Sequence, residues 1–176
     1  MPSKIQSILV GGLLSAVTGV IVAVAQQMSG ASDPLNPQPV LGVIFGLLGC
    51  MVALSSGLVA VWHYTSENEL TISGGQGVGI GVLAGIVYAV AAIALSWLLV
   101  AVGLLPSPEE TLDMVRQSGA FDTPGAEQAE AITKIMVTWG YLVITAISGI
   151  VMGLIGGAIG AAVFKRGSEE EMELSE

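Results

Sequence analysis

Charged side chains are scarce in this sequence, and four long stretches lack Asp, Glu, Lys, Arg and His altogether. Charged residues make up 11% of the chain and hydrophobic residues 53%, and the mean hydropathy is +0.81. Soluble domains contain about 25% charged residues, so this composition excludes a water-soluble globule. The stretches without charge cover residues 5–25, 40–62, 77–105 and 135–164.

Cysteine, histidine and basic residues are also rare. Cys50 is the single cysteine, which excludes an intrachain disulfide, and we expect it to act as a small packing residue. His63 is the single histidine, so two histidines of this chain cannot hold a haem. Five basic residues against fourteen acidic ones argue against a nucleic-acid partner. No phosphate-binding lysine loop or zinc-binding cysteine pattern occurs, so we expect neither a cofactor nor a metal.

Each uncharged stretch is long enough to form a transmembrane helix. At about 1.5 Å of rise per residue, each can cross a hydrocarbon layer of roughly 30 Å. Within lipid the backbone must satisfy its own hydrogen bonds, which favours helices. We therefore predict an all-α, polytopic membrane protein: one four-helix bundle over residues 1–166, followed by an acidic, disordered tail at 167–176.

The first stretch has a rival interpretation as a secretory signal. Ala23-Val24-Ala25 before Gln26 resembles a cleavage site. Signal cores are usually about 7–15 residues long, and this run is nearer 20, so we expect a retained helix.

Basic residues flanking the spans predict the orientation. Lys4, Lys165 and Arg166 lie on one side of the membrane, and Arg116 and Lys134 on the other. By the positive-inside rule, both termini are expected in the cytoplasm of a multi-pass protein of the inner membrane.

The connection between the third and fourth spans predicts a short amphipathic helix. Ser107 is followed by Pro108 and, three positions on, by Glu110, which is the pattern of a capping box with proline at the first helical position. Thr123-Pro124 marks a second helix start that is expected to continue into the fourth span.

Small residues recur at four-residue spacing in every span. Such rows let helix backbones approach closely in lipid. They do not indicate whether the partner helix belongs to the same chain, so a homo-oligomer or a larger membrane complex is also possible. The glycines expected to pack are Gly11, Gly19, Gly42, Gly46, Gly77, Gly81, Gly85, Gly149, Gly153 and Gly157.

The start of the third helix carries the best-defined local motif. Ser73 and Gln76 have the spacing of a second capping box, within Ile72-Ser73-Gly74-Gly75-Gln76. This segment, with Gly81, resembles a family of small four-helix bacterial membrane proteins that is common in the Bacteroidota and catalogued as a domain of unknown function. That family usually has aromatics and a lysine where this chain has Gly74, Val78 and Gly79. The resemblance implies the fold and no established activity.

One polar cluster could carry chemistry. His63 and Glu67 stand one helical turn apart, with Glu69 close by, and could share a metal ion or a proton. An interfacial polar patch is the commoner role for such residues. We therefore expect a structural or accessory membrane component packed through glycine-rich faces. A passive pore or small-molecule carrier, built by oligomerisation or from two helical hairpins, is the alternative, followed by a membrane enzyme with residues in its loops.

Overall fold

The regular structure of this chain is helical throughout its described part. The computed structural model describes residues 3–31, 33, 35–36, 38–122 and 125–165, and so the acidic tail predicted at 167–176 lies outside it. The elements in chain order are α1 (Lys4–Met28), α2 (Pro39–Asn68), α3 (Gly74–Ala101), α4 (Pro108–Gln117), α5 (Glu127–Ile135), the π-helical turn η1 (Met136–Gly140) and α6 (Tyr141–Val163).

Four helical segments are long and apolar enough to cross a membrane. They are α1, α2, α3 and the continuous run of α5, η1 and α6 from Glu127 to Val163. The short helix α4 lies between the third and fourth of them. The predicted fold class, an all-α bundle of four spanning helices with a short amphipathic helix before the last, is confirmed.

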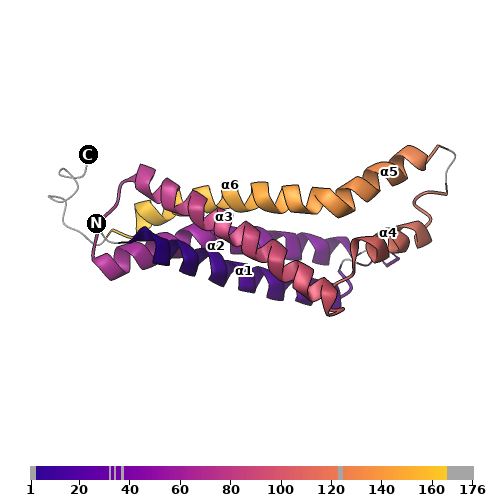
Figure 1. Cartoon of the computed structure of the whole chain (residues 1–176), viewed down its shortest axis with the longest axis horizontal. Helices are drawn as coiled ribbons and strands as arrows, with labels where there is room; N and C mark the ends of the chain where they lie inside the picture. The colour runs from indigo at the N-terminus through magenta and orange to yellow at the C-terminus, as the bar shows by residue number, and fades with distance from the viewer. Residues whose placement is uncertain (1–2, 32, 34, 37, 123–124, 166–176) are drawn as a thin grey trace.

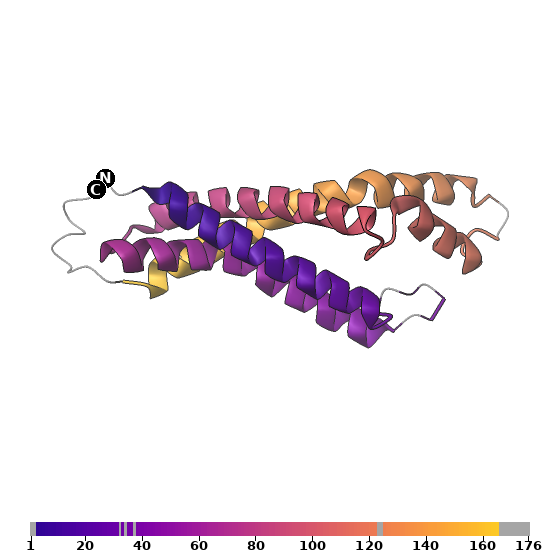
Figure 2. The same ribbon diagram turned by 60° about the horizontal axis from the view of Figure 1, so that its bottom comes forward.

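The bundle consists of two helix pairs that meet at one end and diverge at the other. α1 packs along α2, and α3 packs along α6 (Figure 1). The start of α1 and the end of α6 lie at the same end of the molecule. The two pairs separate toward the opposite end, where α4 and α5 extend beyond the bundle (Figure 2).

Glycine brings the backbones of α3 and α6 into direct contact. A Cβ atom placed on Gly81 would lie 2.8 Å from the Gly157 Cα and closer still to the Gly153 carbonyl oxygen. A Cβ placed on Gly77 would likewise meet the backbone of Gly157, and one placed on Gly85 would meet the backbone of Gly149. Because these neighbours are backbone atoms, no side chain can move aside to admit a methyl group, and glycine is the residue that fits.

A second set of small residues joins α2 to α1 and α6. On Gly11, a Cβ would meet the Ala60 Cβ and backbone nitrogen at 2.7 Å. On Gly57, it would meet the backbone nitrogen of Gly157 at 2.6 Å, and on Gly156 the Leu54 carbonyl oxygen. α6 is therefore in close contact with α3 through one glycine face and with α2 through another.

Other residues of the predicted rows lie differently. A Cβ placed on Gly19 would lie 3.4 Å from the Tyr88 hydroxyl oxygen, which is an ordinary contact distance. A Cβ on Gly42 would come no closer than 4.0 Å to Ala31, and one on Gly46 would meet no described atom within 4 Å. Cys50, expected to pack, is exposed on the same helix. The first half of α2 thus turns its small residues away from the other described helices of this chain.

Two helix ends differ from the limits of the uncharged stretches. α2 continues to Asn68, beyond residue 62, and ends where Glu69 takes a left-handed backbone conformation with φ of 52°. A polar residue does not by itself end a helix, because its backbone can keep the helical conformation. Here the Asn68 side chain donates to the Tyr64 carbonyl oxygen within the last turn of α2. α3 stops at Ala101 rather than near Pro106, and Gly103 follows with φ of 75°.

The size of the side chains between the helices changes along the bundle. Near the termini the contacts are made by glycine and alanine, with Ala16, Ala60 and Ala84 fully buried. Tyr88 marks the change, because its ring lies between Gly19 of α1 and Gly149 of α6. Beyond it, α3 carries larger side chains such as Trp97 and Leu98, which are more than half exposed.

Candidate functional site

The diverging end of the bundle encloses a cleft of about 520 Å³. The end of α1, the end of α3, helix α4 and the junction of η1 with α6 all contribute to its lining. Pockets that hold drug-sized molecules have volumes of roughly 300–1,000 Å³. Its apolar walls include Trp97, Val100, Met114, Val137 and Leu142.

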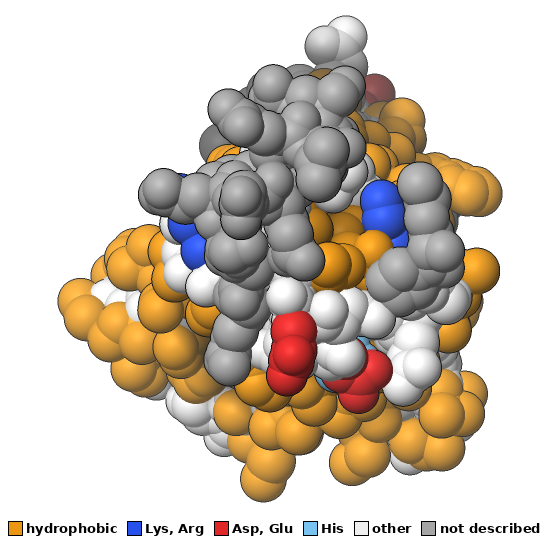
Figure 3. Space-filling model, turned by 90° about the vertical axis from the view of Figure 1, so that its left-hand side faces the viewer, with side chains coloured by type: hydrophobic (Ala, Val, Ile, Leu, Met, Phe, Trp, Pro, Cys, Tyr) orange, Lys and Arg blue, Asp and Glu red, His pale blue; other side chains and the backbone are white. Residues whose placement is uncertain are grey.

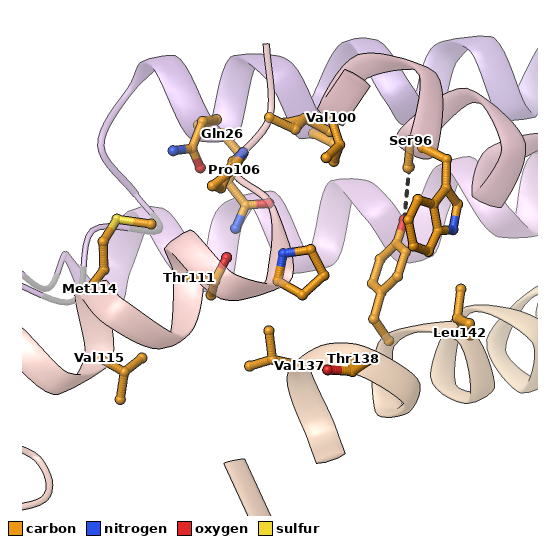
Figure 4. A pocket seen from close by; sticks show the side chains of 16 residues that line it. Gln26, Ser96, Val100, Pro106, Thr111, Met114, Val115, Val137, Thr138 and Leu142 are labelled. Atoms are coloured by element: carbon orange, nitrogen blue, oxygen red, sulfur yellow. Dashed lines mark hydrogen bonds between the residues drawn. The ribbon is translucent and has the colours of Figure 1, made fainter. Parts of the chain in front are cut away.

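Uncharged polar groups are set into these walls. The hydroxyl groups of Ser96 and Tyr141 are 2.9 Å apart and link α3 to α6 across the cleft (Figure 4). Gln26 lies on the opposite side from Val137, and Gln27, Thr111 and Thr138 complete the polar lining. None of the described lining residues is Asp, Glu, Lys, Arg or His.

The π-helical turn shapes one wall of the cleft. In η1 the fourth span is wound with i→i+5 hydrogen bonds over Met136–Gly140 before α6 resumes at Tyr141. Val137 and Thr138 of this turn line the cleft together with Tyr141 and Leu142. Because a π-helical turn changes the angular register of the residues that follow it, this turn helps to set which side chains face α3. Such turns occur often at functional sites.

Helix α4 covers the cleft from outside. Its first turn has the predicted capping box in full: the Ser107 hydroxyl accepts from the Glu110 amide, and the Glu110 carboxylate accepts from the Ser107 amide at 2.7 Å. The amide and hydroxyl of Ser107 hold the pKa of Glu110 below its ordinary value. Thr111, Met114 and Val115 of α4 line the cleft, and Leu112 is buried.

An arginine connects α4 to α5. Arg116 donates to Asp113 at 2.7 Å and to Glu130 through two of its nitrogens, at 2.9 and 2.5 Å. Both carboxylates raise the pKa of Arg116, Glu130 first. The cover of the cleft is therefore attached to the extended end of the fourth span by an exposed ion pair.

The polar cluster predicted around His63 lies at the other end of the molecule. The His63 Nε2 atom is 3.7 Å from the Glu67 carboxylate, and its Nδ1 atom is 3.0 Å from the hydroxyl of Ser7 on α1. Glu69 ends α2 and joins neither contact. Acidic side chains gather on this end face, with basic ones to either side (Figure 3). Within the described chain, no three His, Cys, Asp or Glu residues are placed to hold a metal ion.

The Ser73 cap is half of the predicted motif. The Ser73 hydroxyl accepts from the Gln76 amide at 3.4 Å. The reciprocal bond from the Gln76 side chain to Ser73 is not formed among the described residues, in contrast to the cap of α4.

The sequence predicted α4, which the structure confirms, and the glycine rows, but it did not predict the cleft. The cleft depends on the divergence of the helix pairs and on η1, and neither leaves a periodic pattern in the sequence. Ser96 and Tyr141 could have been noted as polar groups near the ends of spans. Ser7 could have been found as a polar residue in the first turn of α1.

Comparison with known proteins places the chain in a family. No curated protein and no solved structure matches it. The sequence profile of a family described as "Protein of unknown function (DUF4199)" matches residues 7–166, which include nearly all of the first span, the other three spans and the cleft. The resemblance to a family of unknown function noted at the start of the third helix is thereby confirmed. The chain belongs to the DUF4199 family.

Proposed function

We propose that the protein is an accessory component of the membrane that binds an uncharged amphipathic small molecule in the cleft at its diverging end. One observation supports this most directly: the cleft combines apolar walls with hydroxyl and carboxamide groups, and its described lining has no charged side chain. A buried ionic ligand without a partner would be costly, whereas a neutral polar head could bond to Ser96, Tyr141 or Gln26.

The packing of the bundle favours this role over the alternatives. The backbone contact between Gly81 and Gly153 closes the space between α3 and α6 near the termini, which argues against a pore through one chain. A membrane enzyme built on His63 would have to use its Nε2 atom and Glu67, because Ser7, the hydroxyl beside Nδ1, is 2% exposed.

Tryptophan fluorescence provides the test. A variant that retains only Trp97, with Trp62 and Trp139 changed to Phe, is placed in phosphatidylcholine nanodiscs and titrated with a brominated diacylglycerol, an uncharged amphiphile that quenches indole on contact. Saturable quenching of Trp97 is expected, because Trp97 lines the cleft. The matched variant that retains only Trp62 should show weak, non-saturating quenching.

A filled cleft provides the second control. Val137→Phe adds bulk to the lining and should abolish the saturable phase. Val151→Phe makes the same change on α6, at a side chain that is 46% exposed and outside the cleft, and should have no effect. Equal quenching of Trp97 and Trp62, or an unchanged titration with Val137→Phe, would refute the proposal.

The location in the cell also belongs to this proposal. We propose a bacterial protein of the Bacteroidota type in the cytoplasmic membrane, with both termini in the cytoplasm. The basic residues Lys4, Lys165 and Arg166 of the terminal segments support it. The cleft would then open on the outer side. In a Cys50→Ala background, Ser118→Cys at the end of α4 should react with an impermeant maleimide in intact cells, because it would lie outside the cell. Failure to react would show that the proposed orientation is wrong.

Association with other chains is proposed for the first half of α2. Gly42 and Gly46 belong to a predicted packing row, and the described helices of this chain do not cover it. A second copy, or a helix of a larger complex, would fit such a face. The size of the protein in mild detergent, compared between wild type and Gly46→Leu, tests this expectation.

A further inference from the structure

A second hollow lies at the terminal end of the bundle, remote from the cleft. It is a groove of about 310 Å³ between the first two turns of α1 and the first three turns of α3. Its apolar walls come from Ile5 and Ile8 of α1 and from Ile80 and Leu83 of α3. At about 1.5 Å of rise per residue, the seven steps from Gln76 to Leu83 extend it for roughly 10 Å along α3.

The polar residues of the groove are confined to one end. Lys4 is the first residue of α1, and Gln76 lies in the first turn of α3. The groove is therefore polar where the helices begin and apolar along the rest of its length. This distribution matches a molecule with one polar head and a hydrocarbon chain.

The side chain of Lys4 is held in place and has no carboxylate partner among the described residues. Its ammonium group lies 5.9 Å from the centre of the Tyr64 ring, and that ring is a fixed support because Tyr64 is 4% exposed. The ion pairs of the described residues involve His63 and Arg116, so no described carboxylate pairs with Lys4. Among the described residues, its positive charge is therefore not neutralised.

Gly79 widens the groove without serving the packing of the bundle. Gly77 and Gly81, on either side of it, are in backbone contact with α6. A Cβ on Gly79 would meet no described atom within 4 Å. Its small size leaves room along α3 that a larger side chain would occupy.

From these observations we infer that the groove between α1 and α3 binds an anionic phospholipid. The phosphate is held by the ammonium group of Lys4 and the carboxamide of Gln76, and one acyl chain lies against the exposed side chains of Ile5 and Leu83. Basic pockets between transmembrane helices suit such head groups. A free phosphate would use the charge but leave the apolar walls unfilled, so the lipid is the better occupant.

Native mass spectrometry of the detergent-purified protein with equal amounts of phosphatidylglycerol and phosphatidylcholine tests the inference. Wild type is expected to retain phosphatidylglycerol preferentially. Lys4→Ala should lower the preference roughly fivefold, the factor that corresponds to about 1 kcal/mol for one basic residue at an anionic surface. Lys4→Arg should keep the preference.

Two further variants separate a specific site from general attraction. Gly79→Leu should remove retention of the lipid with the fold intact, because the new side chain enters open space. Lys165→Ala removes the same charge from the end of the fourth span, outside the groove, and should change nothing. An equal loss with Lys165→Ala, or full retention with Gly79→Leu, would overturn the inference. If inorganic phosphate alone displaced the lipid, the groove would be a site for a free anion, and the phospholipid inference would be wrong.

Discussion

The contact between α3 and α6 can be tested with two alanine substitutions on one helix. Gly81→Ala places a methyl group against backbone atoms of Gly153 and Gly157, and Gly79→Ala places the same group in open space half a turn away. The two variants have the same composition and the same added volume. They therefore separate helix–helix contact from the general effect of replacing glycine.

The magnitude follows from the geometry. On Gly81 the new Cβ would lie 2.8 Å from the Gly157 Cα, and ordinary contact begins at 3.4 Å, so α3 and α6 must move apart. Overpacking of this kind costs about 1–3 kcal/mol. Alanine regains up to about 1 kcal/mol of helix propensity at either position. We expect Gly81→Ala to lower the free energy of unfolding by about 1–2 kcal/mol and Gly79→Ala to leave it equal or higher.

Unfolding from dodecylmaltoside micelles by added dodecyl sulfate, followed by circular dichroism, measures both values. Gly153→Leu, on the α6 side of the same contact, should exceed the effect of Gly81→Ala, because a larger group must enter the same space. Equal stability of the Gly81 and Gly79 variants would refute the reasoning, since it would mean that the helices are not held by backbone approach.

Three other outcomes follow from the structure. Ser15→Ala removes a hydroxyl bond between α1 and α2, 2.9 Å long, and should cost about 0.6 kcal/mol of unfolding free energy in micelles; a loss several times larger would contradict this. Arg116→Ala should change the free energy of unfolding little, because its pair with Glu130 is exposed, yet it should raise amide exchange in α4. The pKa of Glu110 is lower in the folded protein, so the α4 cap is fully present above the ordinary value of 4.5 and is lost as pH falls through the folded value. Exchange protection of α4 should fall over that range in wild type and be low at every pH in Ser107→Ala.

Much of the fold was predictable because the bilayer imposes one strong constraint. A stretch without charge that is long enough to cross lipid has few alternatives to a helix, so the spans could be placed from composition alone. The α4 cap could also be predicted, because a capping box lies within four neighbouring residues. The end of α2 could not, because it depends on the backbone conformation of Glu69 and not on the last apolar residue.

Pairing between helices required the structure. The spacing of Gly77, Gly81 and Gly85 predicts a close contact but does not identify the opposing row. The same spacing in Gly42 and Gly46 faces no described helix of this chain. Which rows meet depends on how the helices are arranged in space. The spacing of residues within one helix contains no information about that arrangement. The cleft could not be predicted from the sequence for the same reason, since it forms where the contacts between the glycine rows end.

The joint formed by Gly81 and Gly153 has backbone on both sides, and this limits how the molecule can move. Elsewhere in a protein, a change of rotamer lets neighbours shift by small amounts. Here there is no side chain to rotate, so α3 and α6 can only tilt or slide as stiff rods. A molecule that separates the helices at the diverging end would therefore tilt each of them along its whole length. That tilt would also shift the end of the bundle that carries the termini.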